Sequence, residues 1–69
     1  MEKLQGVIGP NIKAKRLALG LSVKDVAIAS GVSEDSVQRI ESGQSNYYMN
    51  TLSAIAETLD MSLSDLFKE

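Results

Sequence analysis

The chain has 69 residues, of which 43% are hydrophobic, and its seven basic and nine acidic side chains give a net charge of −2 at pH 7. This length suits one small domain, residues 1–69 with a core region between 8 and 67, and such domains depend on close helix packing or on association for stability. Cysteine and histidine are absent, which excludes disulfides, thiol nucleophiles, imidazole catalysis and zinc sites, so we expect a binding protein and not an enzyme, with no cofactor and no metal.

A first helix is expected from about Pro10 to Leu19. Proline suits the first turn of a helix, because its missing amide hydrogen would have no partner there, and Gly20 can end the helix. This segment offers Ile12, Leu19 and Leu21 to the core.

The next block, VKDVAIASGVSEDSVQRIES from Val23 to Ser42, fits two short helices that meet at a tight turn. Ser22 can cap the first helix, and Ala27 leaves room for the second helix to approach closely. Gly31 can take the left-handed conformation that reverses the chain, and the hydroxyl of Ser33 can cap the second helix, which runs to about Ser42.

The second helix of this block has two different faces. Val37 and Ile40 point to one side, and the opposite arc is polar throughout. The polar residues are Glu34, Asp35, Gln38, Arg39 and Ser42. Such a face could enter a DNA major groove and bond to base edges, or it could be an ordinary solvated helix face. The helical periodicity alone favours the second alternative, an ordinary solvated helix face.

The last third of the chain predicts a loop, Gly43 to Tyr48, and two more helices. One helix continues through Leu59, and Ser62 opens the other, with Asp65 as its capping-box partner. The expected core of the whole chain is Ile12, Leu19, Leu21, Val26, Val32, Val37, Ile40, Leu52, Ile55, Leu59, Leu63, Leu66 and Phe67.

These motifs, in this order, resemble the Cro/CI-type (Xre-like) helix-turn-helix family, which includes the lambdoid phage repressors. The most specific ones are the KxxR of Lys13 and Arg16, the GLS of 20–22, the turn with Ala27 and Gly31, the V..I.ES.G run of 37–43 and the closing SLSDLF. The resemblance covers about Ile8 to Phe67. It implies an all-α, five-helix lambda repressor-like DNA-binding domain with a central helix-turn-helix at 23–42.

The resemblance also implies double-stranded DNA as the partner, with helix 33–42 in the major groove. The candidates for base contact are Glu34, Asp35, Gln38 and Arg39. The candidates for phosphate contact are Lys24, Ser33, Ser36, Ser42, Gln44, Ser45, Asn46 and Tyr47. By the same resemblance Arg16 should pair with Glu41, and the alternative is two independent surface charges.

The sequence departs from the family pattern where DNA would be touched. Val23 replaces the usual phosphate-binding glutamine, and neutral residues replace lysine or arginine in the loop after 43. Glu34 and Asp35 stand where relatives carry neutral base readers, although carboxylates can accept from cytosine amino groups. Arg39 is the best candidate reader. It could instead form an i,i+4 ion pair with Asp35, and both hold if Asp35 orients the guanidinium.

The charge is unevenly distributed. Residues 11–39 hold five of the seven basic side chains and three of the nine acids, whereas residues 40–69 hold one basic side chain and five acids. A domain with so few cations should bind DNA weakly and with a shallow salt dependence unless it forms a homodimer.

Several apolar residues lie off the expected core stripes, namely Leu17, Ile28, Tyr47 and Tyr48. They are a partner surface or single exposed side chains, which are common in any protein. For Met61, Leu63, Leu66 and Phe67 we expect core packing, with a two-fold dimer contact as the family-like alternative.

The sequence is compatible with two functions. One is a sequence-specific transcriptional regulator, a homodimeric repressor that reads a near-palindromic operator with half-sites about 34 Å apart. The other is a protein-interaction module that retains the fold and has little DNA affinity.

We expect no membrane association, because no apolar stretch is long enough to span a bilayer and the start, MEKLQGVIGP, lacks the features of a signal peptide. A cytoplasmic, nucleoid-associated protein of prokaryotic or phage origin is therefore expected.

Overall fold

Five helices follow one another in the computed structural model, which describes the backbone of residues 2–44 and 48–68 and the side chains from residue 7 onward. They are α1 (Glu2–Ala18), α2 (Val23–Ser30), α3 (Glu34–Glu41), α4 (Met49–Thr58) and α5 (Leu63–Leu66). The described residues contain no strand, and the all-α, five-helix prediction is confirmed.

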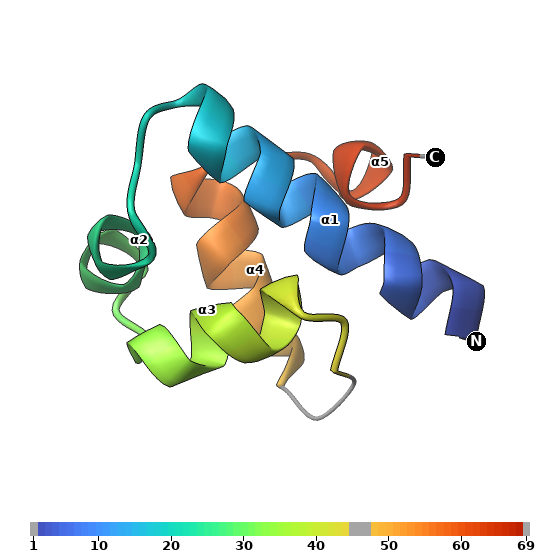
Figure 1. Cartoon of the computed structure of the whole chain (residues 1–69), viewed down its shortest axis with the longest axis horizontal. Coiled ribbons are helices and arrows are strands. Elements are labelled where there is room, and N and C mark those ends of the chain that lie inside the picture. The colour runs from blue at the N-terminus through green and yellow to red at the C-terminus, as the bar shows by residue number, and fades with distance from the viewer. Residues whose placement is uncertain (1, 45–47, 69) are drawn as a thin grey trace.

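The five helices form one cluster with α2, α3 and α4 packed around each other. In Figure 1 α1 runs across the upper part of the view, with α3 below it and α5 beside it. Helix α2 packs on both α3 and α4, and α1 contacts α3 and α5. Helix α3 is therefore supported from three sides and keeps one face towards solvent.

Serine caps begin three of the helices, as the sequence predicts. The hydroxyl of Ser22 accepts from the amide of Asp25 at 2.9 Å, and the carboxylate of Asp25 accepts from the amide of Ser22 at 2.9 Å. Ser62 and Asp65 form the same capping box on α5, and Ser33 caps α3. These bonds from the serine backbone and hydroxyl hold the pKa of Asp25 and of Asp65 below the ordinary value.

The turn between α2 and α3 depends on Gly31. Its backbone is left-handed, with φ 73° and ψ 27°, and its amide faces the carbonyl of Ile28 at 3.3 Å. No heavy atom lies within 4 Å of the place that a Cβ would take, so the backbone angle, and not lack of space, is what requires glycine here. The predicted glycine turn is confirmed.

The core lies where the five helices meet. The buried apolar residues are Ile8, Ile12, Val26, Ala27, Val37, Ile40, Leu52, Ile55, Ala56, Leu59 and Leu66. Leu21, Val32 and Met61 are partly buried and pack against this set. Most of the predicted core is therefore confirmed, and α1 adds Ile8, which lies outside the helix that the sequence predicts.

The predicted start of the first helix is wrong. Helix α1 begins at Glu2, and Pro10 lies in its interior. A proline there cannot donate a hydrogen bond to the preceding turn. Ile8 is nevertheless buried in the core, and its apolar contacts favour continuing the helix on the N-terminal side of Pro10.

Three residues of the predicted core are exposed, and that part of the prediction is also wrong. Leu19 is 49% exposed, because it follows the last residue of α1 and lies in the turn. Leu63 and Phe67 are 66% and 39% exposed. Helix α5 has only four residues and directs a single side chain, Leu66, into the core.

Asn11 ties the end of α5 to α1. Its side-chain amide donates to the carbonyl of Leu66 at 2.8 Å and to that of Lys68 at 2.7 Å. The carbonyls at the end of a helix lack partners within the helix, so these two bonds stabilise the short α5.

Helix α1 crosses the last turn of α3 at very close range. A Cβ built on Gly9 would lie 2.5 Å from the carbonyl oxygen of Ile40 and 2.8 Å from that of Glu41. Only glycine lets the two backbones approach this closely.

Further along the same crossing, Arg16 bonds to Glu41. The Arg16 Nε donates to Glu41 Oε2 at 2.7 Å and Nη2 donates to Oε1 at 3.0 Å, while Nη1 donates to the carbonyl of Leu21 at 2.9 Å. The two side chains are only 9% and 8% exposed. The bond to Glu41 raises the pKa of Arg16 above its ordinary value, although burial acts in the opposite direction.

We expect Glu41→Ala to destabilise the fold strongly, because it leaves the buried guanidinium of Arg16 without its carboxylate. The cost should be about 3 kcal/mol or more, which for a domain of this size lowers the melting temperature by roughly 10 °C or more. Thermal unfolding followed by circular dichroism measures this. Glu57→Ala, which removes an exposed glutamate of α4, is the control and should change little. Equal melting temperatures for the two variants would contradict the structural role of the pair.

We expect Gly9→Ala to destabilise the protein although alanine is the better helix former. Helix propensity alone would favour alanine by about 1 kcal/mol, but overpacking against the α3 carbonyls typically costs 1–3 kcal/mol, and backbone cannot move aside as a side chain can. Urea unfolding should therefore show a net loss of stability. Ala14→Gly at an exposed site of α1 reports propensity alone. A stabilised Gly9→Ala variant would show that the helices are not in close contact.

Candidate nucleic-acid interface

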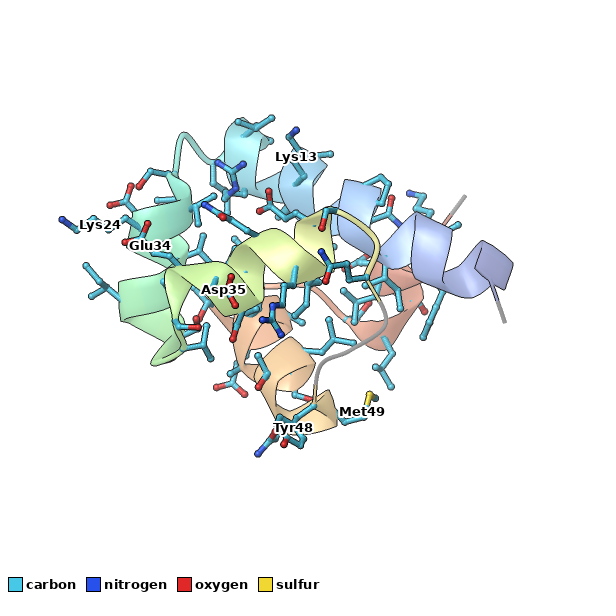
Figure 2. All side chains as sticks on the ribbon, turned by 60° about the horizontal axis from the view of Figure 1, so that its bottom comes forward. Lys13, Lys24, Glu34, Asp35, Tyr48 and Met49 are labelled. Atoms are coloured by element: carbon cyan, nitrogen blue, oxygen red, sulfur yellow. The ribbon has the colours of Figure 1, made fainter. Side chains whose placement is uncertain are left out.

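The exposed face of α3 brings the four predicted base-contact residues together. Val37 and Ile40 are buried, and all four candidates are exposed. Figure 2 looks onto this face, with Glu34 and Asp35 in the first turn of the helix and Glu34 on the side towards Lys24 of α2. The candidates are Glu34, Asp35, Gln38 and Arg39.

Arg39 and Asp35 form an ion pair on this face. Arg39 Nε lies 2.8 Å from Asp35 Oδ2, and the side chains are 45% and 69% exposed. A surface pair with i,i+4 spacing contributes only about 0.3–0.5 kcal/mol to a helix. The pair is therefore too weak to matter much for folding, and both groups are accessible to a ligand.

A shallow hollow of about 530 Å³ runs along α3 towards α1. Lys13 of α1 lines it together with Gln38, Arg39 and Ser42 of the α3 region. Lys13 belongs to the KxxR motif and is not among the contacts predicted from the sequence. The spacing to Arg16 was the available signal, because Lys13 lies one turn before the residue that anchors α1 to the end of α3.

The predicted phosphate contacts are only partly described. Lys24, on α2, and Gln44, three residues after the end of α3, are exposed. Ser45, Asn46 and Tyr47 lie outside the described residues.

The three described serines among these candidates, Ser33, Ser36 and Ser42, already make hydrogen bonds within the protein. The Ser42 hydroxyl donates to the carbonyl of Arg39 at 3.0 Å, and the Ser33 and Ser36 hydroxyls lie 2.9 Å apart. Each hydroxyl has one hydrogen to donate. Ser33 and Ser36 together therefore retain one hydrogen for a phosphate, and Ser42 would first have to leave Arg39.

The beginning of α2 carries a carboxylate of its own. Asp25 closes the capping box with Ser22, and Val23, in the position of the family's glutamine, is half-buried against the core. A carboxylate at this helix end repels phosphate, and the neighbouring Lys24 offsets that charge.

The charges around α3 nearly cancel. Apart from the Arg16–Glu41 pair, α2 and α3 carry two basic side chains and three acidic ones. Lys13 on the edge of the hollow balances the third acid. Net charge at this face therefore offers little attraction to an anionic partner, and specific hydrogen bonds would have to contribute more.

Exposed apolar residues lie outside this face. Tyr48 and Met49, at the beginning of α4, are strongly exposed and lie on the opposite side of α3 from Lys13 in Figure 2. Leu17 and Ile28 are exposed as expected from their places off the core stripes. Tyr47 lies outside the described residues.

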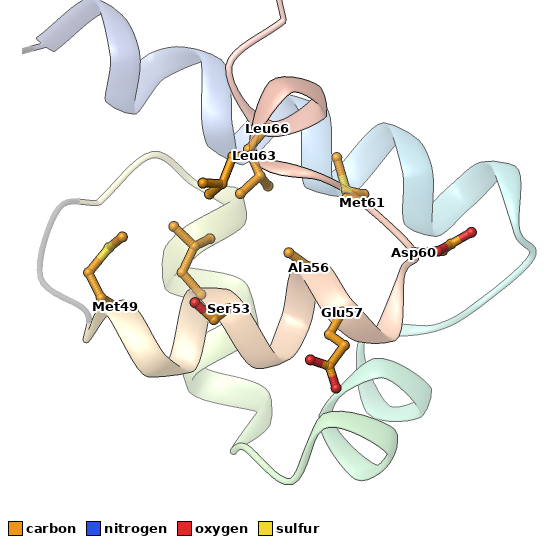
Figure 3. A pocket seen from close by; sticks show the side chains of 9 residues that line it. Met49, Ser53, Ala56, Glu57, Asp60, Met61, Leu63 and Leu66 are labelled. Carbon is orange, nitrogen blue, oxygen red and sulfur yellow. The ribbon is translucent and has the colours of Figure 1, made fainter.

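A groove of about 280 Å³ separates α4 from α5 (Figure 3). Met49 and Ala56 of α4 and Leu63 and Leu66 of α5 supply its apolar lining. Leu63 and Met49, at 66% and 64% exposure, border the groove and are open to solvent.

Within the described part of the chain, no cluster of three or more acidic, cysteine or histidine residues could hold a metal ion. None of the described helices has the length and apolar character needed to cross a membrane.

Comparison with known proteins gives one match. A family model for helix-turn-helix proteins matches residues 12–66, which includes the C-terminal part of α1, from residue 12 to residue 18, and all of α2 to α5. No curated protein and no solved structure matched the chain. Since the family match covers most of the sequence and the five helices place the predicted turn at Gly31, the chain belongs to the Cro/CI-type (Xre-like) helix-turn-helix family of DNA-binding regulators.

Proposed function

We propose that this protein is a sequence-specific transcriptional regulator, a dimeric repressor that inserts α3 into the major groove of its operator. The observation that carries the proposal is the exposed polar face of α3 on a helix held from three sides. Rigid support matters, because base readout requires donors and acceptors at fixed positions.

The side chains of this face suit distinct base edges. Arg39 can donate to O6 and N7 of guanine, and Gln38 can both donate to and accept from adenine. Glu34 and Asp35 only accept, so they fit amino groups such as that of cytosine. The phosphate contacts would come from Lys13, Lys24 and the loop after α3, which includes Gln44 and the predicted Ser45, Asn46 and Tyr47.

Dimer formation would compensate for the small number of cations. One copy offers few phosphate contacts, and two copies on one operator double them. We place the dimer contact at the α4–α5 groove, because Leu63 and Met49 are apolar and exposed and both line it. A two-fold dimer would set the two α3 helices about one DNA turn, roughly 34 Å, apart and require a near-palindromic operator. Such a repressor acts on the nucleoid, in the cytoplasm.

The acidic side chains favour a second candidate function. Asp25, Glu34 and Asp35 would all disfavour phosphate, as expected if the fold serves to bind another protein and has lost most of its DNA affinity.

A selection experiment distinguishes these functions. Purified protein is incubated with fragments of the source genome at two salt concentrations, and the bound fragments are sequenced. The repressor function predicts enrichment of a near-palindromic site, with more fragments retained at the lower salt concentration. Absence of any enriched fragment, with a defined protein complex recovered from the same cells, would support the interaction module.

We expect Arg39→Ala to relax discrimination at one G·C position of the selected site, by about 1–3 kcal/mol, because a bidentate guanine contact is lost. Competition titrations with single-base variants of the operator measure this. Lys24→Ala is the comparison, since loss of a phosphate contact weakens all sequences alike and lowers the salt slope by about one. If Arg39→Ala also weakened every sequence equally, Arg39 would be a phosphate contact and not a base reader.

We expect Leu63→Glu to prevent association, because it places a charge in the centre of the proposed apolar contact. Sedimentation should then show a monomer, and operator affinity should fall by roughly tenfold or more as the second half-site is lost. Leu17→Glu changes an equally exposed leucine of α1 and should preserve both properties. If the Leu63→Glu variant remained dimeric, the dimer interface would not lie at the α4–α5 groove.

A further inference from the structure

We infer that Asp35 is a specificity-determining residue that acts through Arg39, so that the two side chains read one G·C base pair as a unit. The inference rests on the proposed DNA-binding function and adds a role for a carboxylate that charge alone would place among the unfavourable groups.

The contact between the two residues leaves the reading end of Arg39 accessible. Asp35 Oδ2 lies next to Nε, the inner nitrogen of the guanidinium, at 2.8 Å. The two terminal Nη groups are the other donors of this planar group, and side by side they match the paired acceptors O6 and N7 of guanine. Asp35 thus restricts how the guanidinium can rotate while its terminal fork remains available to the base.

Restricting the rotation raises discrimination. A flexible exposed arginine can turn towards the nearest phosphate, which carries no sequence information. An arginine held along the helix face by its neighbour one turn earlier presents its fork in one direction, towards the groove. The other bases do not offer two adjacent acceptors there, because adenine places an amino donor beside N7 and thymine carries a methyl group beside O4.

Asp35 also makes non-specific binding weaker. At a distance, the negative charge of the Asp35 carboxylate cancels the positive charge of Arg39. The pair therefore adds little electrostatic attraction to the phosphates of arbitrary DNA. At the correct site the carboxylate can accept from the amino group of a neighbouring cytosine or adenine, and beside a guanine O6 or thymine O4 it would be repelled. The operator should therefore contain the guanine that Arg39 reads and, next to it, a cytosine or adenine whose amino group lies within reach of Asp35.

Glu34 provides a matched control within the same helix. It has the same charge and is also exposed, but it lies at the beginning of α3 towards Lys24, whereas the partner of Arg39 is Asp35. Replacing either carboxylate by its amide removes one negative charge from the face. Only Asp35→Asn removes the carboxylate that orients Arg39. A base contact by Glu34 would concern a different base pair, so Glu34→Gln can lower affinity for the operator without changing the G·C preference at the Arg39 position.

The experiment compares Asp35→Asn with Glu34→Gln, each made in the wild-type and in the Arg39→Ala background. Dissociation constants are measured for the selected operator, for the operator with the Arg39 base pair changed from G·C to A·T, and for unrelated DNA at the same salt concentration. Because all three positions are exposed and the ion pair contributes only about 0.3–0.5 kcal/mol, similar melting temperatures are expected, and they verify that every variant is folded.

We expect both single amide variants to bind unrelated DNA more tightly by a similar factor, since each gains the same charge. Asp35→Asn alone should lower the preference for G·C over A·T, by roughly tenfold. In the Arg39→Ala background Asp35→Asn should have no further effect on that preference.

An unchanged G·C preference in Asp35→Asn, or an equal loss in Glu34→Gln, overturns the inference while the DNA-binding function stands. A wild-type chain that selects no DNA sequence overturns the proposed function and this inference together. The two failures are therefore distinguishable from the wild-type measurement alone.

Discussion

The crossing of α1 over the last turn of α3 is the constraint on which the rest of the molecule depends. Gly9 brings the two backbones within contact of each other, and the Arg16–Glu41 pair closes the same crossing with two hydrogen bonds. A third bond, from Arg16 to the carbonyl of Leu21, also holds the chain between α1 and α2. Because the charges are largely buried and satisfied, the position of α3 relative to α1 is fixed.

The fixed position of α3 determines how its polar face can bind a partner. The face has little net charge, and several hydroxyls near it are already engaged in bonds within the protein. Strong attraction to arbitrary DNA is therefore not available, and the proposed DNA binding relies on the fit of a few side chains to base edges. Asp35, Gln38 and Arg39 lie on the one helix whose orientation the α1 crossing determines. The rigid position of α3 and the small net charge of its polar face together favour specificity for a DNA sequence over affinity for DNA in general.

The short α5 is less buried in the core than α3 is. It contributes Leu66 to the interior and depends on Asn11 of α1 for the bonds at its end, while Leu63 remains open to solvent. In a domain with so small a core, an exposed apolar side chain beside a groove is a natural place for association. The proposed dimer would use this side of the molecule and leave α3 free for DNA.

The sequence by itself determined the features that depend on near neighbours. The serine caps at 22, 33 and 62 and the left-handed glycine at 31 involve groups within about four residues, so their signals are complete in the local sequence. The Arg16–Glu41 pair joins residues 25 positions apart, and only the family resemblance suggested it. The tertiary structure alone decided that Pro10 lies inside α1, that Leu63 is exposed and that Lys13 borders the α3 face. Each of these depends on where a distant helix lies, because burial is a property of the packed chain and not of a local pattern.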